Sequence, residues 1–295
     1  GQFSMVPVAA QPDSCQRIEY LKQVFFESLC GNESIVSPSF SIAGATVLIT
    51  GASAGLGAEF ARQLAPRVRG LILVARREEA LQSVGEMLRL QYPHLNVIVC
   101  PADVSTEAGR STIRMLVTER LLPLSFLINN AGLGDYGTFE TAESRKVQEQ
   151  IDVNITALVQ LTHELLPVLK QQAPSAILNV SSLAGTLPLP EMAIYAATKA
   201  FVTSFTEALR IELAPQRITV AAVCPGPTPT TFSQTARREG GLDTNRSGQG
   251  FLRQSNEVVV SQALAAIERD LALVNPGWGV TIAAAFFRLI PRWLL

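Results

Sequence analysis

The sequence has few of the residues that mark metal-binding, disulfide-bonded or nucleic-acid-binding proteins. It contains four cysteines without a Cys-x-x-Cys pair and only two histidines, so we expect no metal site. Four scattered thiols favour a reducing compartment and therefore a cytoplasmic protein. Lysine and arginine total 24 against 25 acidic residues, and this balance gives no reason to expect nucleic acid as a partner.

Long apolar runs are also scarce. The first 30 residues lack the basic start and apolar core of a secretory signal. The most apolar stretch, 278–295, is interrupted by Arg288, Pro291 and Arg292 and does not qualify as a transmembrane helix. With 47% hydrophobic and 17% charged residues, the composition predicts an ordinary soluble globular protein.

Apolar runs and helical patterns alternate through the middle of the chain. The strand candidates are 45–50, 70–75, 96–100, 124–129, 176–180 and 218–223, and the helical patterns lie near 57–65, 78–91, 106–120, 140–172 and 191–213. Near-continuous apolar strands separated by helices indicate a parallel sheet covered on both faces. We therefore predict an α/β fold, a three-layer doubly wound Rossmann-like sheet, in a single domain over 44–275.

Three further segments are predicted around this sheet. Residues 1–43 form an N-terminal extension, with an amphipathic helix at 14–30 and a linker rich in Ser and Pro at 31–43. Residues 231–256 are rich in arginine and glycine and predict a flexible lid over the substrate. Its arginines either form a solvated face or meet a phosphorylated carrier. The apolar tail 276–295 could cover the pocket, join subunits or lie on a membrane surface.

A glycine-rich loop directly follows the first strand candidate. A doubly wound fold binds the pyrophosphate of a dinucleotide at this point, because glycines let the backbone approach and the helix N-terminus supplies N–H groups. A tight turn without a ligand is the alternative. The candidate cofactor-binding residues of the loop are Gly51, Ser53, Ala54, Gly55, Leu56 and Gly57.

The end of the second strand indicates which dinucleotide is bound. An acidic residue there commonly bonds the ribose of NAD, whereas this strand is followed by Arg76. A guanidinium at this place favours the 2′-phosphate of NADP, so we expect NADP rather than NAD. The alternative is a solvated arginine paired with Glu78 or Glu79. After the third strand, Asp103 and Val104 either contact the adenine, or Asp103 is a helix N-cap.

Tyr195 and Lys199 stand four residues apart in a predicted helix, so their side chains project from one face. A nearby cation favours the phenolate and lowers the pKa of a tyrosine, which suits the phenol for acid–base chemistry. A core aromatic next to a solvated amine is the alternative interpretation of the spacing alone.

These motifs together resemble the successive signatures of the short-chain dehydrogenase/reductase superfamily. The motifs are Thr50-Gly51-x-x-x-Gly55-x-Gly57, Asn129-Asn130-Ala131-Gly132, Ser182, Tyr195-x-x-x-Lys199 and Pro225-Gly226. They occur in the order and at the spacings of that family, over about 45–275. The resemblance implies a one-domain, usually seven-stranded enzyme that oxidises alcohols or reduces carbonyls with NAD(H) or NADP(H). It also implies a homodimer or homotetramer.

The resemblance assigns roles to individual residues. Tyr195 would be the general acid in reduction, and Lys199 would lower its pKa and bond the nicotinamide ribose. Ser182 would orient and polarise the substrate oxygen; strand alternation places its neighbour Ser181 on the opposite face. Asn154 would support a proton-relay water, although a locally satisfied helix amide is the alternative. The remaining cofactor-binding candidates are Asn130, Ala131, Gly132, Pro225, Gly226, Thr228 and Thr230.

Two positions depart from the family pattern. Pro229 removes a donor from the nicotinamide loop and stiffens it, which leaves the relative roles of Thr228 and Thr230 open. Ala54 stands where many NADP-using relatives carry a basic residue, so the NADP prediction depends chiefly on Arg76.

The sequence therefore predicts an NADP-dependent oxidoreductase of the EC 1.1.1 type. It would transfer a hydride between NADP(H) and a carbonyl/secondary alcohol pair on a hydrophobic small molecule. Two alternatives remain. One is a nucleotide-sensing regulator that kept the fold and lost turnover, and the other is a nucleotide-sugar epimerase, which can also use a Tyr-x-x-x-Lys pair.

Overall fold

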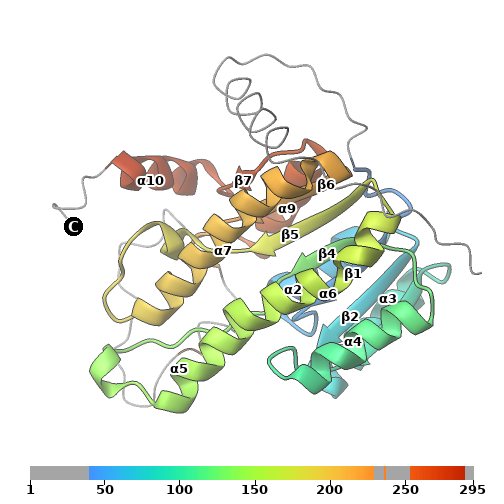
Figure 1. The fold of residues 1–295 in the computed structure, drawn as a ribbon, viewed down its shortest axis with the longest axis horizontal. Coiled ribbons are helices and arrows are strands. Elements are labelled where there is room, and N and C mark those ends of the chain that lie inside the picture. Colours follow the sequence, from blue (N-terminus) through green and yellow to red (C-terminus); the bar gives the residue numbers. More distant parts are fainter. Residues whose placement is uncertain (1–39, 229–235, 237–252, 290–295) are drawn as a thin grey trace, which may run out of the picture. The chain divides into compact units, whose positions relative to one another are not determined.

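The computed structural model describes residues 40–228, 236 and 253–289. These residues belong to one compact unit, which spans Pro38–Leu295, and Figure 1 shows its course from blue to red. The predicted helix at 14–30, Thr230 and most of the predicted lid lie outside the described residues, as does the end of the tail.

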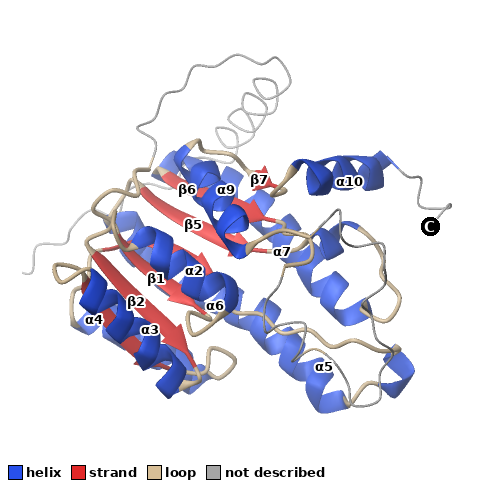
Figure 2. Ribbon diagram, turned by 180° about the vertical axis from the view of Figure 1, so that it is seen from behind, coloured by secondary structure: helices blue, strands red, loops and turns tan. Residues whose placement is uncertain are grey.

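A seven-stranded, wholly parallel sheet forms the middle of this unit (Figure 2). Its strands are β1 (Thr46–Thr50), β2 (Gly70–Ala75), β3 (Asn96–Pro101), β4 (Leu124–Asn129), β5 (Ser175–Val180), β6 (Ile218–Val223) and β7 (Leu273–Val274). Their spatial order is β3-β2-β1-β4-β5-β6-β7, so the winding direction reverses between β1 and β4. Ligands of open α/β sheets bind outside the carboxyl ends of the strands at such a switch point.

Helices cover both faces of the sheet, as Figures 1 and 2 show. One face packs against α2 (Gly55–Leu64), α3 (Glu78–Gln91) and α9 (Asn256–Glu268), and the other against α4 (Glu107–Glu119), α6 (Leu158–Gln171) and α7 (Ala193–Leu213). Residues 144–171 are nearly one helix: α5 (Ser144–Ile151) passes through a π-helical segment, η2 (Asp152–Ala157), into α6. The three-layer doubly wound fold is thus confirmed.

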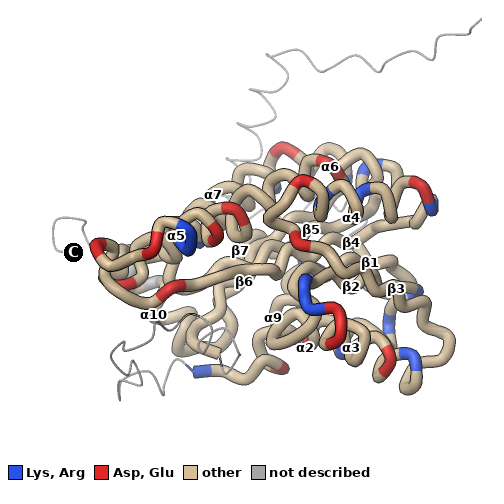
Figure 3. Tube along the Cα trace, turned by 90° about the horizontal axis from the view of Figure 1, so that it is seen from below, with Lys and Arg blue, Asp and Glu red and all other residues tan. Residues whose placement is uncertain are grey.

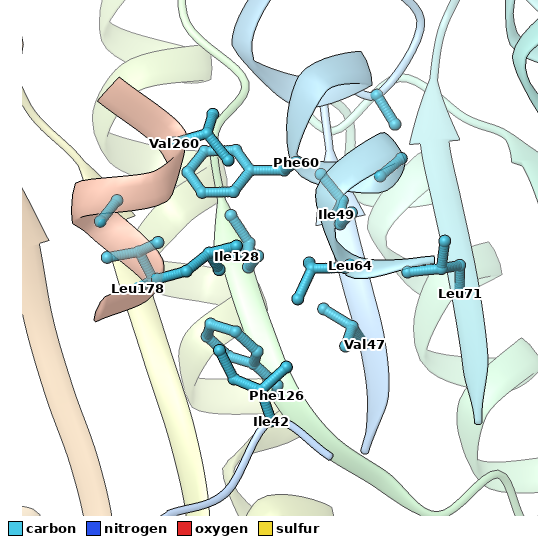
Figure 4. Close-up of a cluster of buried hydrophobic side chains, with 14 of the residues drawn as sticks. Ile42, Val47, Ile49, Phe60, Leu64, Leu71, Phe126, Ile128, Leu178 and Val260 are labelled. Carbon is cyan, nitrogen blue, oxygen red and sulfur yellow. The ribbon is translucent and has the colours of Figure 1, made fainter. Parts of the chain in front are cut away.

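Alternate side chains along each strand pack against the helices on opposite faces of the sheet. In β1, Val47 and Ile49 contribute to the core on the α2 and α9 side, whereas Leu48 contributes to the core on the other side. Figure 4 shows the first of these clusters, in which Phe60 of α2 and Val260 of α9 lie over the strands. Both faces of each central strand are buried, which explains the near-continuous apolar runs.

The residues just before β1 belong to this core. Phe40 is 4% exposed and Ile42 is fully buried, and the ring of Phe40 meets Phe126 edge to face at 5.3 Å between centroids. The end of the predicted linker 31–43 is therefore anchored under the sheet, because its two apolar side chains are removed from water there.

The structure adds elements that the sequence patterns did not predict. They are α9, the two-residue strand β7, short 3-10 turns including η3 (Leu183–Thr186), and α10 (Trp278–Leu289). Charged positions of both signs are mixed along the helices and loops (Figure 3). Among the described residues, no helix has the length and apolar character needed to cross a bilayer.

Candidate active site

The glycine-rich loop connects the end of β1 to the start of α2. Gly51 and Gly55 have positive φ values of 68° and 56°, a region that glycine enters without steric cost. A Cβ on Gly57 would lie 2.2 Å from the carbonyl oxygen of Gly51, so only glycine lets the helix approach the loop this closely. The N-cap residue Ala54 makes no side-chain cap hydrogen bond, and the first turn carries no acidic residue. The N–H groups of this turn are therefore suited to an anion such as a phosphate.

Asn130 braces this loop against β4. Its Nδ2 donates to the carbonyl oxygens of Thr50 (2.8 Å) and Gly51 (3.3 Å). The hydroxyl of Thr50 in turn accepts from the backbone N–H groups of Asn130 and Ala131, each at 3.0 Å. These bonds join the two strands at the switch point.

Two arginines follow β2 at the rim of the same loop. Arg76 Nη1 lies 3.7 Å from Asp103 Oδ2 in an ion pair whose side chains are 55% and 33% exposed. Arg77 Nη2 donates to Ser53 Oγ at 3.4 Å. The sequence singled out Arg76 alone, whereas in the structure Arg77 contacts the glycine loop and Arg76 pairs with Asp103 after β3.

In the loop after β3, the structure excludes one of the two roles expected for Asp103, that of a helix N-cap. Asp103 is not the helix N-cap: Thr106 caps α4 by accepting from the N–H of Gly109 at 3.1 Å. The carboxylate of Asp103 instead accepts from the backbone N–H and the hydroxyl of Ser105, at 2.9 and 2.7 Å. A short Asx-type turn satisfies this carboxylate locally and leaves Val104, which is 6% exposed, under the loop.

A buried arginine that the sequence did not single out holds this loop from below. Arg110 is 8% exposed, and its Nη1 donates to the carbonyl oxygens of Val104 and Ser105, at 3.0 and 2.9 Å. The residue lies on the inner side of α4, one turn after the loop. A helical pattern containing one inward arginine was the only available signal in the sequence.

Ser182 and Tyr195 come together at the carboxyl end of β5. Ser182 follows that strand, and its hydroxyl hydrogen-bonds the phenol of Tyr195. The serine oxygen also accepts from the N–H of Ala184 at 3.1 Å, which caps the η3 turn. Tyr195 is in the first turn of α7 and is 9% exposed.

Ser181 turns away from this contact, as the alternation along the strand predicts. Its hydroxyl donates to the carbonyl oxygen of Lys199 at 2.8 Å and is paired with the hydroxyl of Thr203 at 2.7 Å. It therefore fastens α7 to β5 from behind, while Ser182 remains on the site side.

Lys199 is buried next to the tyrosine. It is 4% exposed, its Nζ lies 5.8 Å from the centre of the Tyr195 ring, and it donates to the carbonyl oxygen of Val180 at 2.8 Å. Burial lowers the pKa of this ammonium to about 8. Among the described residues it has no carboxylate within ion-pair distance.

The pKa of Tyr195 differs from the sequence expectation. A cation beside the phenol was expected to lower this pKa, but burial dominates and raises the pKa of Tyr195 to about 12, against which the hydrogen bond from Ser182 acts only partly. A buried phenolate loses its hydration, and a lysine close to its ring does not restore it. In this structure Tyr195 is therefore a protonated donor at neutral pH.

Asn154 connects the π-helical segment to the site. Its Oδ1 accepts from the N–H of Leu133 and its Nδ2 donates to the carbonyl oxygen of Leu133, both at 2.8 Å. Nδ2 also donates to the hydroxyl of Thr198 at 3.0 Å. The amide is thus bonded to other elements rather than satisfied within its helix. A Cβ on Gly132 would lie 3.4 Å from Lys199 Nζ and 3.5 Å from Asn154 Oδ1, so the three residues adjoin.

The loop after β6 closes this region. The carbonyl oxygen of Pro225 accepts from the N–H of Leu183 at 2.9 Å, which ties the loop to the residue after Ser182. Gly226 and Thr228 follow in the same loop, and Thr230 lies outside the described residues. In the part of the chain that the structure describes, no group of three or more His, Cys, Asp or Glu side chains could hold a metal ion.

The doubly wound sheet, the anion-suited loop at its switch point and the Ser182–Tyr195–Lys199 cluster beside it define a dinucleotide-dependent oxidoreductase fold. Residues 45–240 match the short chain dehydrogenase family. The chain belongs to the short-chain dehydrogenase/reductase family.

Several characterised proteins resemble the chain. A ketoacyl reductase (HetN) from a Nostoc species is 30% identical over 75% of this chain and 80% of that protein. An 11-beta-hydroxysteroid dehydrogenase from Pinus massoniana is 40% identical over 58% of this chain, and the alignment spans 48% of that relative. The solved structure of a short-chain dehydrogenase from Sphingobium yanoikuyae in complex with NADPH has a TM-score of 0.70 and 30% identity, covering 84% of this chain and 97% of the other.

Proposed function

We propose that this protein transfers a hydride between NADP(H) and a carbonyl/secondary alcohol pair on an apolar small molecule. The observation that carries the proposal is the meeting of four side chains at one end of the sheet. Ser182 bonds the phenol of Tyr195, and Lys199 and Asn154 adjoin Gly132 beside them. The four side chains come from α7, the π-helical segment η2 and the loop after β5, and packing alone does not require these polar groups to gather at one place.

The residues at the switch point fit a dinucleotide. The uncapped first turn of α2 would hold the pyrophosphate, and Asp103 and Val104 would border the adenine. Lys199 would bond hydroxyl groups of the nicotinamide ribose, because its ammonium is buried without a carboxylate in the described part of the chain and a neutral polar partner suits it. When bound, the coenzyme supplies or accepts the hydride.

The proton is handled by the side chains of this chain. Tyr195 keeps its hydroxyl proton at neutral pH, because burial raises its pKa to about 12, and it would give that proton to the oxygen of a carbonyl substrate. Ser182 would donate a hydrogen bond to the same oxygen and polarise it. Asn154 fixes Leu133 and Thr198, and would keep the route from Lys199 to water in place.

Two arginines support NADP over NAD. Both follow β2: Arg76 pairs with Asp103, and Arg77 already reaches Ser53 of the glycine loop. A 2′-phosphate would meet guanidinium groups directly after β2, where an enzyme that binds NAD commonly carries an acidic residue. Hydrogen bonds between such charged groups contribute about 1.5 to 3 kcal/mol each. The NADPH bound to the Sphingobium relative agrees with this preference.

The names of the relatives and the apolar surroundings of the site support the proposal of an apolar substrate. The ketoacyl reductase and the hydroxysteroid dehydrogenase are named for acyl and steroid compounds. In this chain the segment after Ser182 runs through Leu183 and is covered by apolar residues of α10. We further propose a cytoplasmic homo-oligomer; the exposed side chains of Phe201 and Ile211 on α7, each 40% exposed, are available for subunit contact.

A panel of ketones, acyl β-ketones and steroid ketones, followed through NADPH absorbance, tests the activity. Replacement of Tyr195 by Phe removes the proton donor with little change in shape, and kcat should fall by a factor of about 10² to 10⁴. Tyr92→Phe is the matched control, because Tyr92 lies at the end of α3 outside the site. Full reductase activity of Tyr195→Phe would refute the assignment, and NADPH binding without turnover of any substrate would support the sensing regulator instead.

A further inference from the structure

Helix α10 has two apolar faces that point in opposite directions. Val280 is fully buried and Ala284 is 2% exposed, and both pack against Leu183. Trp278, Ile282 and Phe286 recur at intervals of four residues. At about 100° per residue, the centres of the two sets lie about 180° apart around the helix axis. In Figures 1 and 2, α10 follows the edge strand β7 and extends past the sheet.

The outward face is apolar and mostly exposed. Trp278 is 72% exposed, Ile282 58% and Phe286 60%. A continuous apolar stripe on the exposed side of a helix is unfavourable in water, and such patches mark sites of contact with a protein or a membrane. Other exposed apolar residues, such as Leu90 and Leu121, do not form a row of three along one helix and need no such explanation.

The charge of the C-terminal segment and the length of α10 favour a lipid surface as the partner of this face. Residues 271–295 contain Arg288 and Arg292 and no acidic residue, although the chain as a whole carries a net charge of −1. An apolar helix face with a tryptophan, in a segment that contains arginine and no acidic residue, suits the boundary of an anionic bilayer. With 12 residues, α10 is too short to span a bilayer, which takes about 20. It would therefore lie in the plane of the surface.

We propose that α10 docks this protein on an anionic phospholipid surface through Trp278, Ile282 and Phe286. The inward face of the helix then connects the surface to the site, because Val280 and Ala284 contact Leu183, the residue after Ser182. An apolar substrate dissolved in the bilayer would reach the site from that side. The docking itself does not require the proposed oxidoreductase activity.

The chain provides its own optical probe for docking. Both tryptophans are in this region, at 278 and 293, so intrinsic fluorescence reports on it alone. With vesicles of phosphatidylcholine mixed with phosphatidylglycerol, we expect a blue shift of the emission and sedimentation of the protein with the vesicles. Vesicles of phosphatidylcholine alone should bind it more weakly, and added salt should reduce binding to the anionic vesicles.

Variants separate docking from misfolding and from activity. Ile282→Ser should weaken vesicle binding by about tenfold, because one large apolar side chain no longer enters the lipid. Leu90→Ser, at an exposed apolar residue of α3, should bind vesicles like the parent protein. Both should keep the parent far-UV circular dichroism and thermal midpoint, which are readouts that do not depend on the proposed activity.

Three outcomes would overturn the proposal. They are the absence of vesicle binding by the parent protein, equal loss of binding in Leu90→Ser, and a change of oligomeric state in Ile282→Ser without any vesicle binding by the parent. The last would assign the face to contact between copies of the chain. A failure of the carbonyl panel with intact vesicle binding would refute the proposed function alone.

Discussion

The burial of the Lys199 ammonium serves the proposed chemistry but lowers the stability of the folded chain. Its ammonium is removed from water and is held by one carbonyl oxygen, that of Val180. The pKa in the folded chain is about 8, whereas an unfolded lysine titrates near 10.4. Below pH 8 both states are charged and the folded state bears the burial cost. Between pH 8 and about 10.4 the folded state loses its proton first, so stability rises with pH.

Replacing Lys199 by Met should therefore stabilise the fold while abolishing activity. Burial of the charged ammonium costs on the order of 3 kcal/mol, which the substitution removes. The substitution also leaves the carbonyl oxygen of Val180 without its hydrogen bond, which costs about 1 kcal/mol or more. We expect a net gain of roughly 1 to 2 kcal/mol in the free energy of unfolding at pH 7, which shrinks towards pH 10. Urea unfolding at both pH values measures it, with the exposed Lys170 replaced by Met as the control. A gain independent of pH, or a loss at pH 7, would contradict the account.

The two arginines after β2 make separable contributions to coenzyme choice. Arg76→Ala should raise the KM for NADPH about 10- to 100-fold, because one or two charge-assisted hydrogen bonds to the 2′-phosphate are lost. The KM for NADH should stay nearly unchanged. Arg77→Ala should act in the same direction and also release Ser53. Initial rates with both coenzymes provide the measurement, and Arg89→Ala, on the far part of α3, is the control. An unchanged ratio in both variants would remove the basis of the NADP assignment.

The sequence predicted which residues gather at the site better than it predicted their pKa values and contacts. The motif order placed Ser182 rather than Ser181 at the site, and the structure has the same arrangement. The pKa direction of Tyr195 was wrong, because motif spacing contains no information on how deeply a phenol is buried. Arg77 and Arg110 escaped notice for a related reason: a guanidinium reaching a loop is indistinguishable in sequence from one in solvent.

At the scale of elements, the loop between β1 and α2 depends on how closely a helix can approach a strand. Gly57→Ala would place a Cβ 2.2 Å from the carbonyl oxygen of Gly51 and 2.6 Å from Asn130 Nδ2. Backbone and a bracing amide must then shift, so we expect a loss of about 1 to 3 kcal/mol in stability together with weaker coenzyme binding.

Thermal unfolding with and without NADPH measures both effects. Gly44→Ala is the comparison, since a Cβ there meets no atom within 4 Å and only the positive φ of 74° imposes strain. If Gly57→Ala proved no more harmful than Gly44→Ala, the close approach would not be what requires glycine.

Elements with strong periodicity were predictable and weak ones were not. Each predicted strand is present, because both of its faces are buried and its residues are apolar throughout. The pattern over 140–172 was one helix in sequence but contains a π-helical segment at Asp152–Ala157, which the apolar spacing does not reveal. The two-residue β7 and the mostly apolar α10 offered neither alternation nor an amphipathic stripe to recognise.

For the whole molecule, coenzyme binding should appear as stability. Binding to the folded state alone adds about 2.7 kcal/mol at a ligand concentration of 100 times Kd, which for a domain of this size corresponds to roughly 5 to 10 °C in the melting temperature. NADPH should produce this shift, and NADH at the same concentration a smaller one. Equal shifts would contradict the predicted preference, and the absence of any shift would contradict coenzyme binding itself.

The sheet order separates the two properties that such an enzyme must combine. Groups suited to the adenosine and pyrophosphate part of the coenzyme follow β1, β2, β3 and β4, before residue 133, whereas Ser182, Tyr195 and Lys199, beside the proposed nicotinamide site, come later in the chain. A single recombination event between β4 and α5 would therefore exchange coenzyme preference while leaving proton transfer and substrate selection intact. On this account, the choice between NADP and NAD and the choice of substrate are encoded in different segments of the gene and could be exchanged independently.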